Sequence, residues 1–73
     1  MEGELQQVVG ARVRAIRLER GMSQEALADA LGVHRTYLGG VERGERNLTL
    51  RTVERLADRL AVDTTALLGT DGR

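Results

Sequence analysis

The stretch that decides the fold is SQEALADALGVHRTYLGGVERGERN, residues 23–47. Ser23 can accept a hydrogen bond from a free backbone N–H at the start of a helix. Apolar residues at helical spacing follow it: Leu27, Ala28 and Leu31. Gly32 then permits the left-handed backbone that ends many helices, and Gly44 offers the same ending further on. The stretch therefore predicts two short helices, 24–31 and about 34–43, joined by a tight turn.

The helix at 34–43 has two different faces. At roughly 100° per residue, Leu38, Val41 and Glu42 point to one side. The other side carries groups that donate hydrogen bonds or leave the backbone bare: Thr36, Gly40 and Arg43, flanked by Arg35, Tyr37 and Gly39. A DNA major groove about 12 Å wide admits such a helix, and Arg is the usual bidentate reader of guanine. The outward face is thus a candidate surface for reading DNA.

These residues resemble a known family. Four groups carry the resemblance: Ser23-Gln24-Glu25, Leu27-Ala28, Leu31-Gly32-Val33 and Glu42-Arg43-Gly44. They look like the helix-turn-helix domain of the Cro and phage-repressor type, also called the xenobiotic-response-element type, over roughly residues 9–68. Within that family, HRTYLGGVERGERNLTL at 34–50 is most similar to the small controller proteins of restriction–modification systems. The resemblance implies an all-α, five-helix, lambda-repressor-like bundle from a bacterium or phage.

Length and composition restrict the function classes. The 73 residues predict one domain, 1–73, with a core at about 5–69 and the helix-turn-helix at about 23–43. The absence of Cys and the single His exclude disulfides and argue against a metal cluster, so no metal or cofactor is expected. No nucleophile–base set is visible either, which argues against an enzyme. The N-terminus does not read as a signal peptide, and no apolar run suits a membrane span, so a cytoplasmic protein is expected.

The charge balance bears on the partner. Eleven Arg and 11 acidic residues give a net charge of zero, which counts against strong nonspecific nucleic-acid binding. A DNA-binding function therefore requires an asymmetric distribution of charge on the surface. Arg35, Arg43 and Arg46 would lie on or just past the outward face, and most acidic residues would lie elsewhere.

The N-terminal helix should run from about residue 4 to 20, because Leu5, Val9, Val13 and Ile16 recur at helical spacing. By resemblance, Arg17 at the edge of this stripe pairs with Glu42, which points inward. The resemblance also implies that Gln24 contacts a DNA phosphate and braces the recognition helix. The alternatives are a solvated Arg17 and a surface Gln24.

The other candidate DNA-binding residues lie on the recognition helix or just after it. His34 should cap the helix or contact a phosphate. Arg35 is the best candidate for reading a base, Thr36 can contact a base edge, and Tyr37 can reach a phosphate or instead pack against the turn. By resemblance, the loop residue Arg46 reaches DNA, although an ordinary surface Arg is the alternative.

Gly39 and Gly40 are unfavourable inside a helix by about 1 kcal/mol each relative to Ala, which suggests a use. We expect Gly40 to allow close approach of the backbone to DNA, with early fraying of the helix as the alternative. Phage repressors often carry a polar base-reading side chain at this position, so their readout does not transfer fully.

Two further helices complete the chain. Thr49 should cap a helix with an inward stripe of Leu50, Val53, Leu56, Ala57 and Leu60, and its arginines 51, 55 and 59 should form a solvated face. Asp63 should cap a short helix that ends at Gly69, followed by a frayed tail at 70–73. Val62, Leu67 and Leu68 are the candidates for a two-fold interface, unless they only close the core of the monomer.

The most consistent interpretation is a sequence-specific regulator of transcription, acting as a homodimer on a pseudo-palindrome in double-stranded DNA. No small-molecule ligand is expected, so protein concentration would set the response. The alternative is a protein-interaction module, such as an antitoxin-like partner, for which the neutral charge is the main support. The sequence does not specify the operator, the target genes, or whether binding activates or represses.

Overall fold

The structure is a computed structural model that describes residues 4–69, and these residues form helices joined by short turns and loops. The helices are α1 (Glu4–Glu19), α2 (Gln24–Leu31), α3 (Arg35–Glu42), α4 (Leu50–Leu60) and α5 (Thr64–Leu68). The predicted all-α class is therefore confirmed, and the helix boundaries lie within about one residue of those expected. The tail predicted at 70–73 lies outside the described residues.

The helix ends follow from local chemistry. The Ser23 hydroxyl accepts a hydrogen bond from the Ala26 N–H at 3.0 Å, and the Thr49 hydroxyl accepts one from the Thr52 N–H at 3.2 Å. Gly32 ends α2 with φ of 71°, in the left-handed region. Helix α4 ends at Ala61, which also takes a left-handed backbone with φ of 60° although it is not glycine. These caps satisfy backbone groups that a helix terminus otherwise leaves without partners.

The core is built from the apolar faces of all five helices. Its members are fully or almost fully buried: Val9, Val13, Leu27, Ala28, Leu31, Leu38, Val41, Val53, Leu56, Ala57, Leu60 and Leu67. Two residues expected on the inward stripes are exposed instead, Leu5 by 43% and Leu50 by 59%. Both lie in the first turn of their helix, where helical spacing continues but the other described elements leave much of the side chain uncovered.

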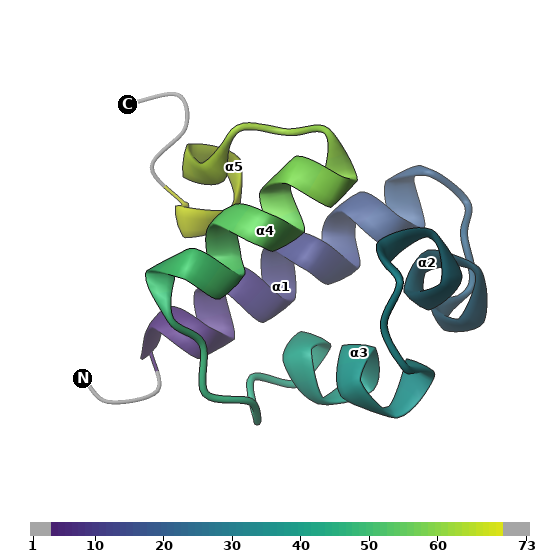
Figure 1. Cartoon of the computed structure of the whole chain (residues 1–73), viewed down its shortest axis with the longest axis horizontal. Coiled ribbons are helices and arrows are strands. Elements are labelled where there is room, and N and C mark those ends of the chain that lie inside the picture. Colours follow the sequence, from purple (N-terminus) through teal and green to yellow (C-terminus); the bar gives the residue numbers. More distant parts are fainter. Residues whose placement is uncertain (1–3, 70–73) are drawn as a thin grey trace.

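Helix α1 runs across the molecule and packs against α3 and α5 (Figure 1). Helix α2 packs against α3 and α4, and α4 packs against α5. Helix α3 lies at the edge of the molecule, below α1 in Figure 1, so that one of its sides faces α1 and the other is open. The arrangement supports α3 from behind while leaving an outer face for a partner.

The predicted interface residues of the last helix do not share one environment. Leu67 has no exposed surface and belongs to the core, so its assignment to a dimer interface was wrong. The short helix α5 turns this side chain toward α1 and α4, where it closes the monomer. Val62 and Leu68 are half-buried and remain partly available.

Candidate nucleic-acid interface

Helix α3 begins with a side-chain cap. The Nδ1 atom of His34 accepts a hydrogen bond from the Thr36 N–H at 3.1 Å. The His34, Arg35 and Thr36 side chains are exposed, and Tyr37 is half-buried against the core. The first turn of α3 therefore presents three polar side chains on a backbone that is fixed at its N-terminus.

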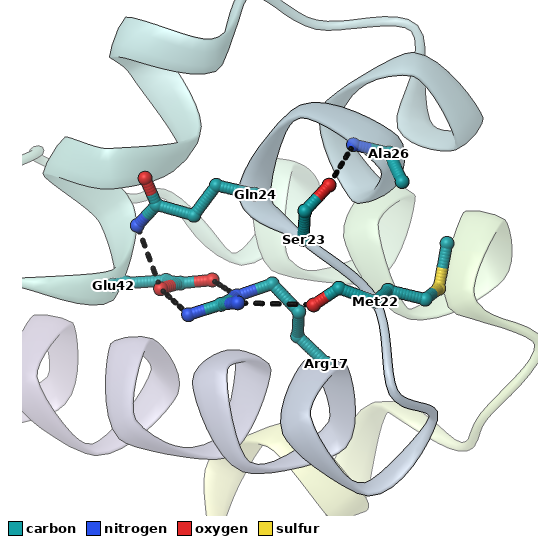
Figure 2. Close-up of polar contacts among 6 residues, drawn as sticks. All are labelled: Arg17, Met22, Ser23, Gln24, Ala26 and Glu42. Atoms are coloured by element: carbon teal, nitrogen blue, oxygen red, sulfur yellow. Dashed lines mark hydrogen bonds and ion pairs between the residues drawn. The ribbon is translucent and has the colours of Figure 1, made fainter.

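A buried polar network holds the other end of α3. Arg17 of α1 donates to Glu42 through Nε at 2.7 Å and through Nη2 at 3.1 Å. Gln24 of α2 donates through Nε2 to Glu42 at 3.0 Å, and Arg17 also donates to the Met22 carbonyl at 3.0 Å (Figure 2). The side chains of Arg17 and Glu42 are only 11% and 2% exposed. One carboxylate thus joins α1, α2 and α3, which fixes the angle at which α3 is presented.

The network also specifies what Gln24 does in the free protein. Its amide N–H group is used to brace Glu42, as the resemblance implied. Gln24 is half-buried at the first position of α2, beside backbone N–H groups that favour an anion. A phosphate contact by Gln24 stays a prediction.

The arginines on the outward face are exposed and weakly engaged. Arg35 approaches Glu25 at 3.9 Å, and Arg43 approaches Glu45 at 3.1 Å, with all four side chains more than half exposed. Exposed ion pairs of this kind contribute about 0–1 kcal/mol to stability. Either arginine can therefore leave its carboxylate partner for a phosphate or a base of DNA at little cost in free energy.

The glycines of α3 are not open to solvent, contrary to our expectation for Gly40. The Arg46 side chain covers Gly40, and a Cβ placed there would lie 3.1 Å from Arg46 Cγ and Nε. Arg46 also lies over the Tyr37 ring, 5.2 Å from its centroid, a cation–π geometry. Arg43 covers Gly39 in the same way. In the free protein, the space that the glycines leave is filled by arginines of the same chain, so close approach of DNA to Gly40 requires Arg46 to move.

Three structural residues were missed by sequence reasoning. Gly10 of α1 lies against the last turn of α3, where a Cβ would overlap the Val41 carbonyl oxygen. Arg20 donates to the Leu60 carbonyl at 2.8 Å, and Arg59 donates to the Leu31 carbonyl at 2.6 Å. These two arginines bind the C-termini of α4 and α2, so Arg59 is not simply part of a solvated face. Of these three residues, only Gly10 could have been noticed in the sequence, because it is a glycine inside a predicted helix with no evident reason for being there.

Within residues 4–69, no cluster of His, Asp and Glu could hold a metal ion. None of the described helices combines the length and the apolar character needed to cross a bilayer.

Known proteins resemble this chain over most of its length. The family model described as "Helix-turn-helix" matches residues 13–67. Control protein C.SmaI of Serratia marcescens is 42% identical over 69 residues, which are 94% of this chain and 82% of that protein. Among solved structures, the restriction–modification controller protein C.AhdI of Aeromonas hydrophila is 42% identical with a TM-score of 0.73, covering 85% of this chain and 94% of that one.

A further solved structure shows a related protein on DNA. It is the restriction–modification controller protein C.Esp1396I, a tetramer in complex with its natural 35 base-pair operator. It is 38% identical to this chain, with a TM-score of 0.75, and the match covers 90% of this chain and 87% of that one.

Proposed function

The chain belongs to the helix-turn-helix family, and from this we propose that it is a sequence-specific DNA-binding regulator of transcription, of the restriction–modification controller type. One observation in the structure carries the proposal: α3 exposes a polar first turn, while its other end is held against α1 and α2 by the buried network around Glu42. A surface that reads bases must be held in a fixed position. The operator-bound relative supports the same use of the fold.

In the proposed complex, α3 enters the major groove and Arg35 reads a guanine through its two parallel N–H groups. Thr36 contacts a neighbouring base edge. Gln24, His34 and Arg43 contact phosphates on either side, and Tyr37 and Arg46 move apart to engage the duplex. Related controller proteins and the operator complex favour DNA as the partner over a protein-interaction module of the same fold. We further propose that the chain works by binding rather than catalysis, in the cytoplasm.

Substituting Arg35 by Ala tests base reading. We expect wild type to enrich a pseudo-palindrome from a random duplex pool, with half-sites about one helical turn apart. Arg35→Ala should lose about 1–3 kcal/mol of binding free energy per half-site and relax the choice at one base pair of each half-site, because a bidentate contact is removed from each. Selection followed by sequencing measures both effects.

Arg51→Ala is the matched control, since Arg51 is an exposed arginine that lies on α4 and not on α3. It should keep the same preferred sequence. If Arg35→Ala lost affinity but kept the wild-type sequence preference at every base pair, Arg35 would be assigned to a phosphate and not to a base. If wild type enriched no sequence at moderate salt, the proposed function itself would fail.

Dimerisation is proposed on the side of the molecule formed by α1 and the start of α5. Val62 and Ala66 line a groove there with Ile16 and Leu18. Leu18 is 52% exposed, a large apolar side chain of the kind that a partner subunit covers. We propose that this groove, together with Leu68, replaces the interface first expected around Leu67.

Leu18→Glu should convert the dimer to a monomer and weaken operator binding, because it places a charge in an apolar contact without disturbing the core. Sedimentation velocity across a concentration series measures the association. Leu50→Glu is the control, since Leu50 is 59% exposed and does not line the groove. An unchanged dimer in Leu18→Glu would show that the interface lies on another surface.

Because association depends on concentration, the dimer would make operator occupancy depend on the amount of protein.

A further inference from the structure

A second concave surface borders the recognition helix. It lies between the turn that joins α2 to α3 and the facing side of α4, and it encloses about 340 Å³. Its floor includes the buried side chains of Leu31 and Leu56 and the half-buried ring of Tyr37. Its rim carries polar side chains: His34, Thr52, Arg55 and Arg59. We call this surface the α4 hollow.

The rim of the α4 hollow is suited to an anion. Among the described residues, none that lines it is acidic, although acidic and basic residues are equal in number over the whole chain. Nδ1 of His34 accepts the Thr36 N–H, so the neutral ring carries its hydrogen on Nε2 and offers a donor. Two arginines add positive charge beside it. The hollow therefore concentrates donors in a chain whose net charge is zero.

The two arginines of the rim have different tasks. Arg59 is anchored, because its Nη1 donates to the Leu31 carbonyl at 2.6 Å. Gly32 leaves room for it, since a Cβ there would lie 2.8 Å from Nη1. Arg55, one turn earlier on α4, makes no hydrogen bond or ion pair within residues 4–69. Arg55 is thus the unengaged charge at a rim that Arg59 helps to shape.

We propose that the α4 hollow binds a phosphate group, with Arg55 as the principal contact and Thr52 and His34 as neighbouring donors. The inference rests on the proposed function, because the source we assign is the backbone of the bound duplex. His34 and Tyr37 belong both to the hollow and to the first part of α3. A duplex that receives α3 therefore runs its backbone beside the hollow, and the phosphates and sugars of that backbone take about half to two-thirds of protein–DNA hydrogen bonds. A free phosphate-bearing molecule offers the same chemistry.

The salt dependence of operator binding tests the duplex as the source. Fluorescence anisotropy with the selected operator gives the slope of log K against log salt concentration. Removing one phosphate contact should reduce the magnitude of that slope by about 0.9, so the loss of one contact from each subunit of the proposed dimer should reduce it by about 1.8. We expect this reduction, with weaker binding, in Arg55→Ala. Arg51→Ala should keep the wild-type slope, since Arg51 lies on the same helix but does not line the hollow. Thermal unfolding of both variants checks that each is folded.

An NMR titration of the protein without DNA tests a free anion as the source. Inorganic phosphate is added at constant ionic strength, with chloride as the comparison. Saturable shifts of the His34 and Thr52 amide signals in wild type, lost in Arg55→Ala, would support a phosphate site even if the operator slope did not change. The proposal is overturned if neither assay distinguishes Arg55→Ala from Arg51→Ala. If wild type selects no operator, the proposed function fails, and the titration alone decides whether the hollow binds phosphate.

Discussion

Replacing Arg17 by Ala should lower the free energy of unfolding by about 3–5 kcal/mol, the usual effect of removing one partner from a buried ion pair. Glu42 is the reason, because its carboxylate is 2% exposed and, among residues 4–69, would keep only the Gln24 amide as a partner. Small domains are stable by about 5–15 kcal/mol in total, so this loss removes a large part of the stability. Urea unfolding followed by circular dichroism measures it.

Two controls separate burial of a charge from loss of a contact. Glu45→Ala breaks the exposed pair with Arg43 and should change the free energy of unfolding by less than about 1 kcal/mol. The double variant Arg17→Met with Glu42→Leu removes both charges and should recover most of the stability lost in the single variant. A loss below 1 kcal/mol in Arg17→Ala would mean that water enters the site and solvates Glu42.

The double variant also addresses function. If it regains stability but binds the operator weakly, the network serves mainly to orient α3. Apolar side chains fill the same space, but they lack the directional hydrogen bonds by which Glu42 joins α1, α2 and α3. Measuring stability and affinity on the same variants distinguishes support of the fold from positioning of the recognition helix.

The helices could be predicted from the sequence because their signals are local. Ser23, Thr49, Gly32 and Gly69 lie where a helix begins or ends, and apolar spacing identified the inward sides of the helices. How deeply a residue is buried depends on elements far away in the chain. For that reason Leu50 was expected inside and is exposed, while Leu67 was expected at an interface and is in the core.

In the candidate site, too, some features could be predicted from the sequence and others depend on contacts between distant parts of the chain. The inward direction of Glu42 followed from helical geometry, and the family resemblance identified Arg17 as its partner. The resting position of Arg46 did not follow from either, because a long side chain in a loop settles on whichever surface is nearby. Here that surface is the Tyr37 ring and the bare backbone of Gly40. The same limit applies to Arg59, whose backbone acceptor is 28 residues away in the chain.

Gly10 is the second position where a single substitution should have a large effect. Helix α1 crosses the last turn of α3 at this residue, and a Cβ would overlap the Val41 carbonyl oxygen and lie 3.0 Å from the Glu42 carbonyl oxygen. Both are backbone atoms, so the overlap can be relieved only by moving a helix. Overpacking of this kind is destabilising by about 1–3 kcal/mol, occasionally more. The gain in helix propensity from Gly to Ala, about 1 kcal/mol, acts in the opposite direction.

We therefore expect Gly10→Ala to lower the free energy of unfolding and to weaken operator binding, because α3 is pushed away from α1. Gly39→Ala is the matched control inside α3. Its nearest obstacle is the end of the flexible Arg43 side chain, at 3.1 Å, which can move aside. This variant should unfold at the same or a higher urea concentration than wild type. If Gly10→Ala were as stable as Gly39→Ala, α1 and α3 could move apart without loss of stability. Close contact at Gly10 would then not be what sets the position of α3.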